Sequence, residues 1–205
     1  MNRGQMRDLL RRQLQDVPDV QWPLDSELDA ILNTAYVLVQ KEIRKVSPTA
    51  HQFWDFINTT AGTSWYPLPA TFGIRRVSLL NTSTVPNTYG KLPLKDYETI
   101  KDVTGTTYYY AKEGQWIGIF PAPPTMINGI ELVHVPIMEM GDDADVPRIK
   151  SPLHIGIVWW AKLLALGETT DATGETKVRL QELLGDIPLW YDVTSDGPEV
   201  MRVTI

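Results

Sequence analysis

Apolar side chains recur every three or four residues along the first part of the chain. The clearest stripe runs from Leu28 to Val46 and places its apolar residues on one face of an amphipathic helix. We expect this helix to begin at Asp25 or Ser26, since either side chain can cap it, and Leu24 to pack back against the first turns. It should end at Ser47, because the residue before a proline avoids helical backbone angles.

Three other segments have the same helical period. In residues 6–14 the apolar side chains recur at helical spacing and arginines lie on the other faces. This pattern predicts a short helix that ends before Pro18. Residues 153–166 are more uniformly apolar and predict a helix that ends at Gly167. Residues 176–184 predict a shorter helix that also ends at a glycine.

Between these helices the apolar pattern is that of β-strands. Two proline-rich stretches punctuate it, Tyr66-Pro67-Leu68-Pro69 and Phe120–Pro124, and residues 81–90 form a turn-rich loop. Glu113-Gly114 predicts the turn of a hairpin. Short strands with frequent turns are typical of a small antiparallel sheet or sandwich. The expected strands are residues 53–60, 74–80, 106–111, 115–120 and 130–135.

These elements predict an α+β fold, in which a helical bundle of N-terminal helices plus C-terminal helices carries an inserted antiparallel β-sheet or sandwich lobe. The helices on either side of the β segment should pack together, which makes that segment an insertion. The last residues show no clear period. We divide the chain into residues 1–48, the N-terminal helices; 49–140, the β lobe; 141–186, the C-terminal helices; and 187–205, a C-terminal tail.

Composition and charge narrow the functional classes. The chain has 205 residues and a mass of 23.2 kDa, and its 43% hydrophobic and 21% charged content is that of a globular protein. Its formal net charge of −6 argues against a function in which the protein clamps nucleic acid through phosphate contacts. An acidic surface would still suit the wall of a conduit for DNA. It has no cysteine, which excludes disulfides and thiolate metal sites.

Neither a targeting signal nor a membrane span is expected. The chain opens with charged helix rather than with an apolar signal sequence. The apolar run from Ile155 to Ala161 is interrupted at Lys162 and is too short to cross a bilayer. We therefore expect a soluble protein with no membrane partner.

Residues able to carry chemistry are scattered. The three histidines, His51, His134 and His154, lie in separate segments without metal-ligand spacing, and we expect structural roles for the last two. No phosphate loop, dinucleotide turn or nucleophile elbow occurs. The acidic run Asp142–Asp145 lacks the glycine and distal glutamate of a calcium loop, so we expect a solvated linker and leave open a weakly held cation at a subunit boundary. We predict no enzyme activity, catalytic residue, metal or cofactor.

Aromatic residues gather at two places. Tyr108-Tyr109-Tyr110 and Trp116 could stack bases on a sheet face. The charge of nearby Lys112 is offset by Glu113, so a sheet core with one wet face is the preferred interpretation. Trp159 and Trp160 are adjacent on the predicted helix, so their side chains point in different directions. One should lie in the core, and the other should contact a second helix or a neighbouring subunit.

Several short motifs follow one another in a specific order. After the N-terminal helices come Tyr66-Pro67-Leu68-Pro69, then Gly114-x-x-Ile117-x-Ile119-x-Pro121-x-Pro123, then Val146-Pro147 before a closing pair of helices. In this order, and over nearly its whole length, the chain resembles the head-to-tail adaptor (connector) proteins of tailed bacteriophages, which dock beneath the portal.

The resemblance implies a virion structural protein of the neck or tail region, made in the host cytoplasm. It implies a homo-oligomeric ring, typically a dodecamer, between the portal protein and tail or nozzle proteins, through which DNA passes without specific binding during packaging and ejection. The helices would form the ring wall, and the β lobe would face outward or toward tail components. The C-terminal segment would reach the portal, with a candidate partner interface of apolar residues that lack an obvious place in the monomer: Trp190, Tyr191, Met201, Val203 and Ile205.

Three questions stay open. A tail-associated hydrolase acting on cell wall or polysaccharide would need paired carboxylates, for which Glu131 and Asp96 are scattered candidates. A β-sheet module that binds carbohydrate or nucleic acid would need an exposed Tyr108–Tyr110 face. The break at Gly185-Asp186-Ile187-Pro188 departs from a long closing helix, so the tail could dock as an extended strand.

Overall fold

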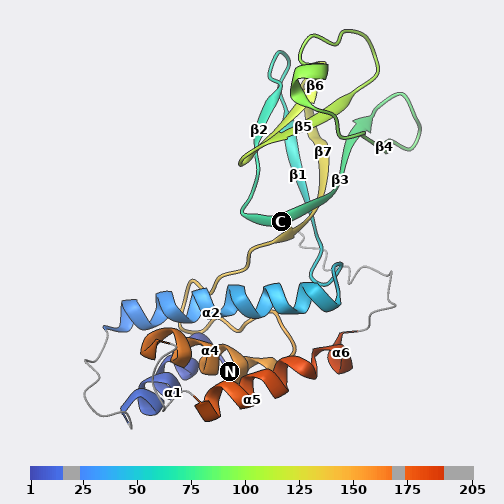
Figure 1. Cartoon of the computed structure of the whole chain (residues 1–205). Helices are drawn as coiled ribbons and strands as arrows, with labels where there is room; N and C mark the ends of the chain where they lie inside the picture. The colour runs from blue at the N-terminus through green and yellow to red at the C-terminus, as the bar shows by residue number, and fades with distance from the viewer. Residues whose placement is uncertain (16–23, 168–173, 192–205) are drawn as a thin grey trace. The chain divides into compact units, whose positions relative to one another are not determined.

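The chain folds into two compact units, and the computed structural model describes residues 1–15, 24–167 and 174–191 (Figure 1). The helical unit comprises the described residues up to Ala50 and again from Met138 to Tyr191. The β unit comprises residues 51–137. Helices and two antiparallel sheets together confirm the predicted α+β fold, a helical bundle with an inserted β lobe.

The helical unit is built around a core that helices from both halves of the sequence share. Its helices are α1 (Arg3–Gln15), α2 (Asp25–Val46), the 3-10 turn η1 (Ser151–Leu153), α4 (His154–Leu166), α5 (Gly174–Gly185) and α6 (Ile187–Trp190). Helices α1, α2 and α4 pack on one another, α5 packs on α4, and α6 contacts α2 and α5. None of the described helices is long and apolar enough to cross a membrane. The fully buried side chains of this core include Met6, Leu10, Leu14, Leu28, Leu32, Ile43, Leu153 and Ile157.

The start of α2 differs from the prediction, although its end does not. The backbone N–H of Leu24 donates to the Glu27 carboxylate at 2.8 Å, which makes Leu24 the residue before the helix. Asp25 does not cap the helix, because it pairs with Arg11 of α1 instead. The Leu24 side chain is 70% exposed, so the predicted packing against the first turns is wrong.

Two side-chain amides of α2 hold the segment that returns from the β unit. Gln40 donates through Nε2 to the carbonyl oxygen of Met138 at 2.7 Å and accepts through Oε1 from the N–H of Met138 at 3.1 Å. Asn33, two turns earlier on the same face of α2, makes the same pair of bonds with Met140 at 3.2 and 2.9 Å. Helix α2 therefore pairs with this segment as a neighbouring β-strand would.

The β unit is a sandwich of two antiparallel sheets. Its elements are β1 (Phe53–Thr59), β2 (Trp65–Pro67), β3 (Thr71–Asn81), β4 (Thr88–Lys91), the short helix α3 (Tyr97–Ile100), β5 (Tyr109–Glu113), β6 (Trp116–Phe120) and β7 (Met126–Pro136). The larger sheet has the order β1-β7-β3-β4, and the smaller has the order β2-β6-β5. Val77 and Ile130 from the larger sheet meet Ile117 and Ile119 from the smaller in one core. The predicted set lacks β2, β4 and α3, because elements of three or four residues are too short to show a period.

The two β motifs that carry the family resemblance are hydrogen-bonded partners. Strand β2 pairs with β6, so that Tyr66 lies opposite Ile117 and Trp65 lies opposite Gly118. A Cβ at Gly118 would lie 2.6 Å from Cε2 of Phe120 and 2.9 Å from Cζ3 of Trp65. The absence of a side chain at Gly118 thus lets these two rings pack edge to face, with centroids 5.6 Å apart.

Replacing Leu32 by alanine tests the core that the two halves of the helical unit share. This side chain is fully buried, so we expect the free energy of unfolding of the helical unit to fall by about 2–5 kcal/mol. Lys41→Ala, at an exposed position of the same helix, should change it by less than about 0.5 kcal/mol. Urea unfolding followed by far-ultraviolet circular dichroism measures both, and equal effects would contradict this assignment of the core.

Candidate functional site

His134 and His154 have structural partners. Nε2 of His134 in β7 lies 2.8 Å from Oδ2 of Asp55 in β1, which ties two neighbouring strands together. Nε2 of His154 lies 3.1 Å from the carbonyl oxygen of Ile149, and burial lowers the pKa of His154, which favours the neutral ring. Across the described ranges of the chain, no group of three His, Cys, Asp or Glu side chains could hold a metal ion.

The two carboxylates named for a hydrolase are engaged in local contacts. Oε2 of Glu131 accepts from Nη2 of Arg76 at 2.9 Å on the larger sheet. Asp96 precedes α3 and caps it, accepting from the N–H of Glu98 at 2.9 Å. Each carboxylate thus has a structural partner, and neither supports a cleft with paired carboxylates.

The three consecutive tyrosines do not form an exposed platform. Tyr108 and Tyr110 pack against the core between the sheets, and burial raises the pKa of Tyr110. Tyr109 packs against a second cluster that contains Phe120. Trp116 on the neighbouring strand is 50% exposed by contrast. The binding-module alternative therefore loses the face on which it rested.

The acidic run is exposed to solvent and is also a structural hub. Asp143 accepts from Arg7 at 2.6 Å and from Arg3 at 3.0 Å, and these hydrogen bonds hold the pKa of Asp143 below its ordinary value. Arg7 also pairs with Asp29 of α2 at 2.9 Å. The run is exposed, as predicted, but it is not a free linker, because the arginines of α1, which lie off its apolar stripe, reach it. Charge pairs therefore join α1, α2 and the run.

Asp145 shapes the turn that presents Asp143 to α1. Its Oδ2 atom accepts from the backbone N–H groups of Gly141 and Asp142 at 2.7 and 2.9 Å. Its carbonyl oxygen accepts from the N–H of Arg3 at 2.8 Å. The hydrogen bonds from the N–H groups of Asp142 and Gly141 lower the pKa of the Asp145 carboxyl group. Both carboxylates thus face donors of the protein itself.

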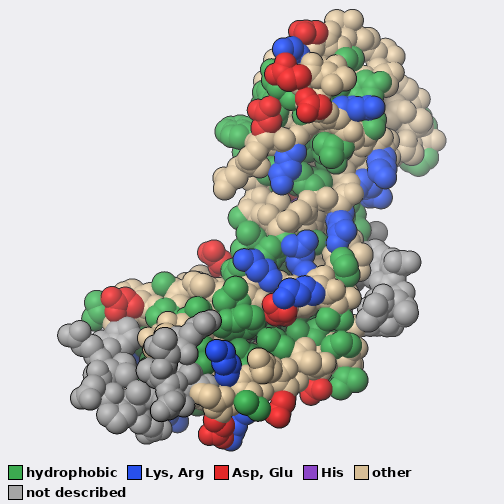
Figure 2. All heavy atoms as spheres, in the orientation of Figure 1, with side chains coloured by type: hydrophobic (Ala, Val, Ile, Leu, Met, Phe, Trp, Pro, Cys, Tyr) green, Lys and Arg blue, Asp and Glu red, His purple; other side chains and the backbone are tan. Residues whose placement is uncertain are grey.

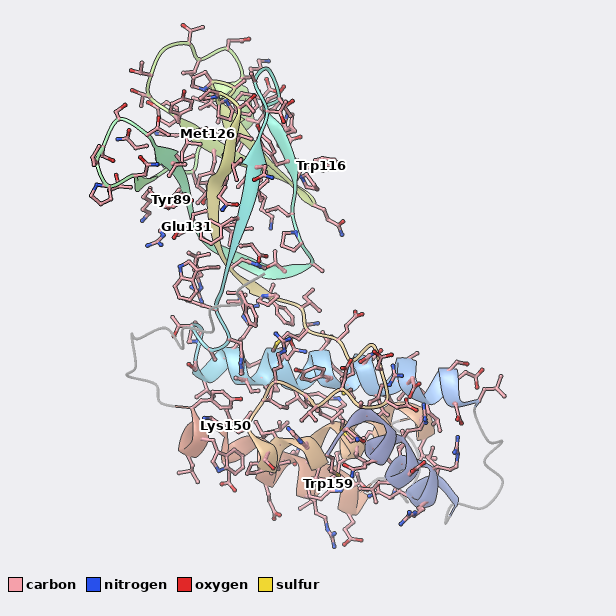
Figure 3. All side chains as sticks on the ribbon, turned by 180° about the vertical axis from the view of Figure 1, so that it is seen from behind. Tyr89, Trp116, Met126, Glu131, Lys150 and Trp159 are labelled. Atoms are coloured by element: carbon pink, nitrogen blue, oxygen red, sulfur yellow. The ribbon has the colours of Figure 1, made fainter. Side chains whose placement is uncertain are left out.

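An apolar groove of about 230 Å³ lies between α4 and α5. Trp160 lines it and also packs against the core of the helical unit, and Trp159, the preceding residue of α4, is half-buried (Figure 3). Two exposed side chains lie on the same helices, Leu164 at 43% and Val178 at 54% exposure. The groove is lined by Trp160, Leu163, Leu164, Lys177, Leu180, Gln181 and Leu184.

One family model describes nearly the whole chain. The model of the SU10 adaptor protein family matches residues 1–202. The chain belongs to the SU10 adaptor protein family. This membership confirms the resemblance to phage head-to-tail adaptors that the order of motifs predicted.

One solved structure has a weak similarity to this adaptor. A chain in a solved structure of the neck of an empty GTA particle is similar to it at 12% identity and a TM-score of 0.32, with 88% of each chain covered. At that score the likeness carries no argument about the arrangement of this adaptor. No curated protein matches the chain.

The predicted partner interface of the adaptor divides into two parts. Tyr191 is 7% exposed in the core of the helical unit, and its hydroxyl accepts from the N–H of Lys150 at 3.1 Å. Trp190 is half-buried against the same core. The expectation that these rings lack a place in the monomer is wrong, because α6 folds onto α2 and α5. The other three residues of the interface, Met201, Val203 and Ile205, lie outside the described residues.

The charge network around Asp143 predicts a specific dependence on pH. Because the folded pKa of Asp143 lies below its ordinary value of 3.8, its contribution to stability is present above that pH and is lost as the pH falls through the lowered pKa. Asp143→Asn should lower the urea midpoint of the adaptor at pH 7, and this difference from wild type should shrink at the lowest pH at which both still fold.

Glu182→Gln, at an exposed carboxylate of α5, serves as the matched control for this variant. It should leave the urea midpoint at pH 7 unchanged. A midpoint difference for Asp143→Asn that stays the same at every pH would show that the carboxylate charge is not what joins the hub.

Proposed function

We propose that this adaptor is a structural protein of the virion neck that forms a closed ring, a dodecamer, between the portal protein and tail or nozzle proteins. DNA passes through the ring without specific binding. The observation that carries the proposal is the match of the adaptor family model to residues 1–202. Each copy of such a ring needs two unlike surfaces, because head-to-tail contacts between unlike surfaces are the ones that close into rings.

The distribution of charge supports a wall that does not grip DNA. The β unit contains six Asp and Glu and six Lys and Arg, so its net charge is zero. Both kinds of side chain are visible on the β unit in Figure 2. The described residues of the helical unit contain twelve Asp and Glu and twelve Lys and Arg, so the net charge of −6 falls on residues 16–23, 168–173 and 192–205. Neither unit has an excess of basic residues that would hold phosphates, and we place the helical unit at the channel wall and the β unit outward or toward the tail because the resemblance to head-to-tail adaptors implies it.

Exposed apolar side chains of the helical unit support contacts with other chains. The groove between α4 and α5 is apolar, and Leu189 of α6 is 78% exposed beside the buried Tyr191. Scattered apolar residues are normal on protein surfaces, but an apolar groove lined by an exposed leucine, here Leu164, is typical of an interface. Met201, Val203 and Ile205 remain proposed as contacts with a partner, while Trp190 and Tyr191 act through the fold of α6.

Assembly with the portal tests the proposed ring directly. We expect mass photometry of the adaptor mixed with its portal to show a complex whose added mass is a whole multiple of 23.2 kDa, with a closed ring in negative-stain images. Leu189→Asp should weaken assembly, whereas Leu94→Asp, at a leucine of the β unit that is 59% exposed, serves as the control. A strictly monomeric adaptor that ignores the portal would contradict the proposal.

Retention on immobilised DNA tests the proposed channel wall. We expect the adaptor to elute from double-stranded DNA at low salt, because a net charge of −6 opposes phosphate contacts. Replacing the exposed Glu182 and Asp186 by lysine should increase retention, which shows that the column responds to charge. Tight retention of wild type, falling steeply with salt, would mean that the protein grips DNA.

A further inference from the structure

The last turns of α2 carry a basic stripe, Lys41 and Lys45, on the outer face of the helix. Both residues are exposed, and four residues of helix separate them by about 6 Å along its axis. Residues 41–46 contain three basic side chains and one acidic side chain, which gives a net charge of +2. The acidic one, Glu42, pairs with Lys45 at 2.6 Å, yet the Lys45 side chain is still 68% exposed. Lys41 has no ion-pair partner among the described residues.

The end of α5 carries an acidic stripe, Glu182 and Asp186, with the same spacing. The N–H of Asp186 donates to the carbonyl oxygen of Glu182 at 3.2 Å, so the helical turn continues as far as Asp186. Both side chains are exposed, and neither has an ion-pair partner within the described part of the chain. Residues 182–190 contain no Lys or Arg, so their net charge is −2. The two stripes thus have opposite charge and equal length.

The two stripes lie on opposite sides of the helical unit. Helix α4 lies between α2 and α5 and packs against both (Figure 1). Helix α2 turns the buried Ile43 toward the core, and α5 turns the buried Leu180 toward α4, so the exposed charges point outward from each helix. Unlike surfaces on opposite sides of one unit are what a head-to-tail contact between copies requires.

Apolar surface adjoins each stripe. On α2, an open groove of about 410 Å³ ends at Lys41. On the acidic side, Val178 lies four residues before Glu182 and is 54% exposed, and Leu189 lies three residues after Asp186 and is 78% exposed. A contact that paired the charges would therefore also bury apolar side chains. The residues that line the groove are Ala30, Asn33, Thr34, Val37, Leu38, Lys41 and Glu139.

We propose that the basic stripe of one copy docks on the acidic stripe of the next copy. The inference rests on the proposed ring, in which each copy contributes two unlike surfaces. A second copy fits each stripe because this chain carries both members of a complementary pair at equal spacing. The charge pairs set the register of the contact, and burial of Val178 or Leu189 beside the groove supplies affinity.

Charge reversal in two separate variants tests the contact. Lys41→Glu with Lys45→Glu, and Glu182→Lys with Asp186→Lys, each place like charges across every contact between identical copies. Each variant alone should therefore form at least about tenfold less ring with the portal than wild type does. An equimolar mixture should restore the ring, because alternating copies pair opposite charges at every contact. Mass photometry measures the ring, and a tag on one variant should show the two in equal numbers.

Controls separate this contact from effects of folding and net charge. Lys95→Glu with Lys112→Glu, at exposed lysines of the β unit, changes the net charge as much as reversal of the basic stripe and should leave the ring unchanged. Circular dichroism shows whether each variant keeps the wild-type fold. A second measurement needs no substitution: zero-length carbodiimide coupling of a wild-type ring made from isotope-labelled and unlabelled copies should join the basic stripe of one copy to the acidic stripe of another.

The outcomes distinguish this inference from the proposed ring. A ring from either reversed variant alone, or a mixture that stays unassembled while wild type closes, overturns the docking of the stripes and leaves the ring in place. Coupling of either stripe to the portal, and not to a second copy, also overturns it. Absence of any ring from the wild-type protein overturns the proposed function first.

Discussion

The fold depends on one constraint: the chain must return to the helix that it left before the β unit. Helix α2 meets this constraint through Asn33 and Gln40, whose amides satisfy both the N–H and the carbonyl of Met140 and Met138. Gln40 is 3% exposed, so its loss would leave buried backbone groups unpaired at a cost of about 1–3 kcal/mol each. Because the returning segment is held on α2, the helix that follows it, α4, packs on α1 and α2 and completes the core.

The Asp143 hub adds a second attachment at the other end of the same segment. It connects α1 to the run that follows Met140, and through Asp29 it also connects α1 to α2. These are partly exposed ion pairs, which contribute less than burial of the apolar core. These ion pairs fix the position of α1 on the bundle, whereas the apolar core supplies most of the stability.

Long periodic elements could be predicted from the sequence, and short or irregular ones could not. The stripe of α2 and the alternation in β7 span enough residues to reveal their period. Strand β2 has no period of its own, and only its pairing with β6 makes Tyr66-Pro67 a strand. Asn33 and Gln40 look like ordinary polar positions of an amphipathic helix, because their partners lie about a hundred residues away. The burial of Tyr191 was missed for the same reason, since it depends on α6 packing on α2.

The central claim is that the helical unit forms the wall of a ring and the β unit lies outward or toward tail components. The most direct measurement is a cryo-electron microscopy reconstruction of this adaptor assembled with its portal. The account predicts a closed ring in which the helical units of all copies line the channel and the β units lie away from it. Isolated copies bound to the portal, or β units lining the channel, would contradict it.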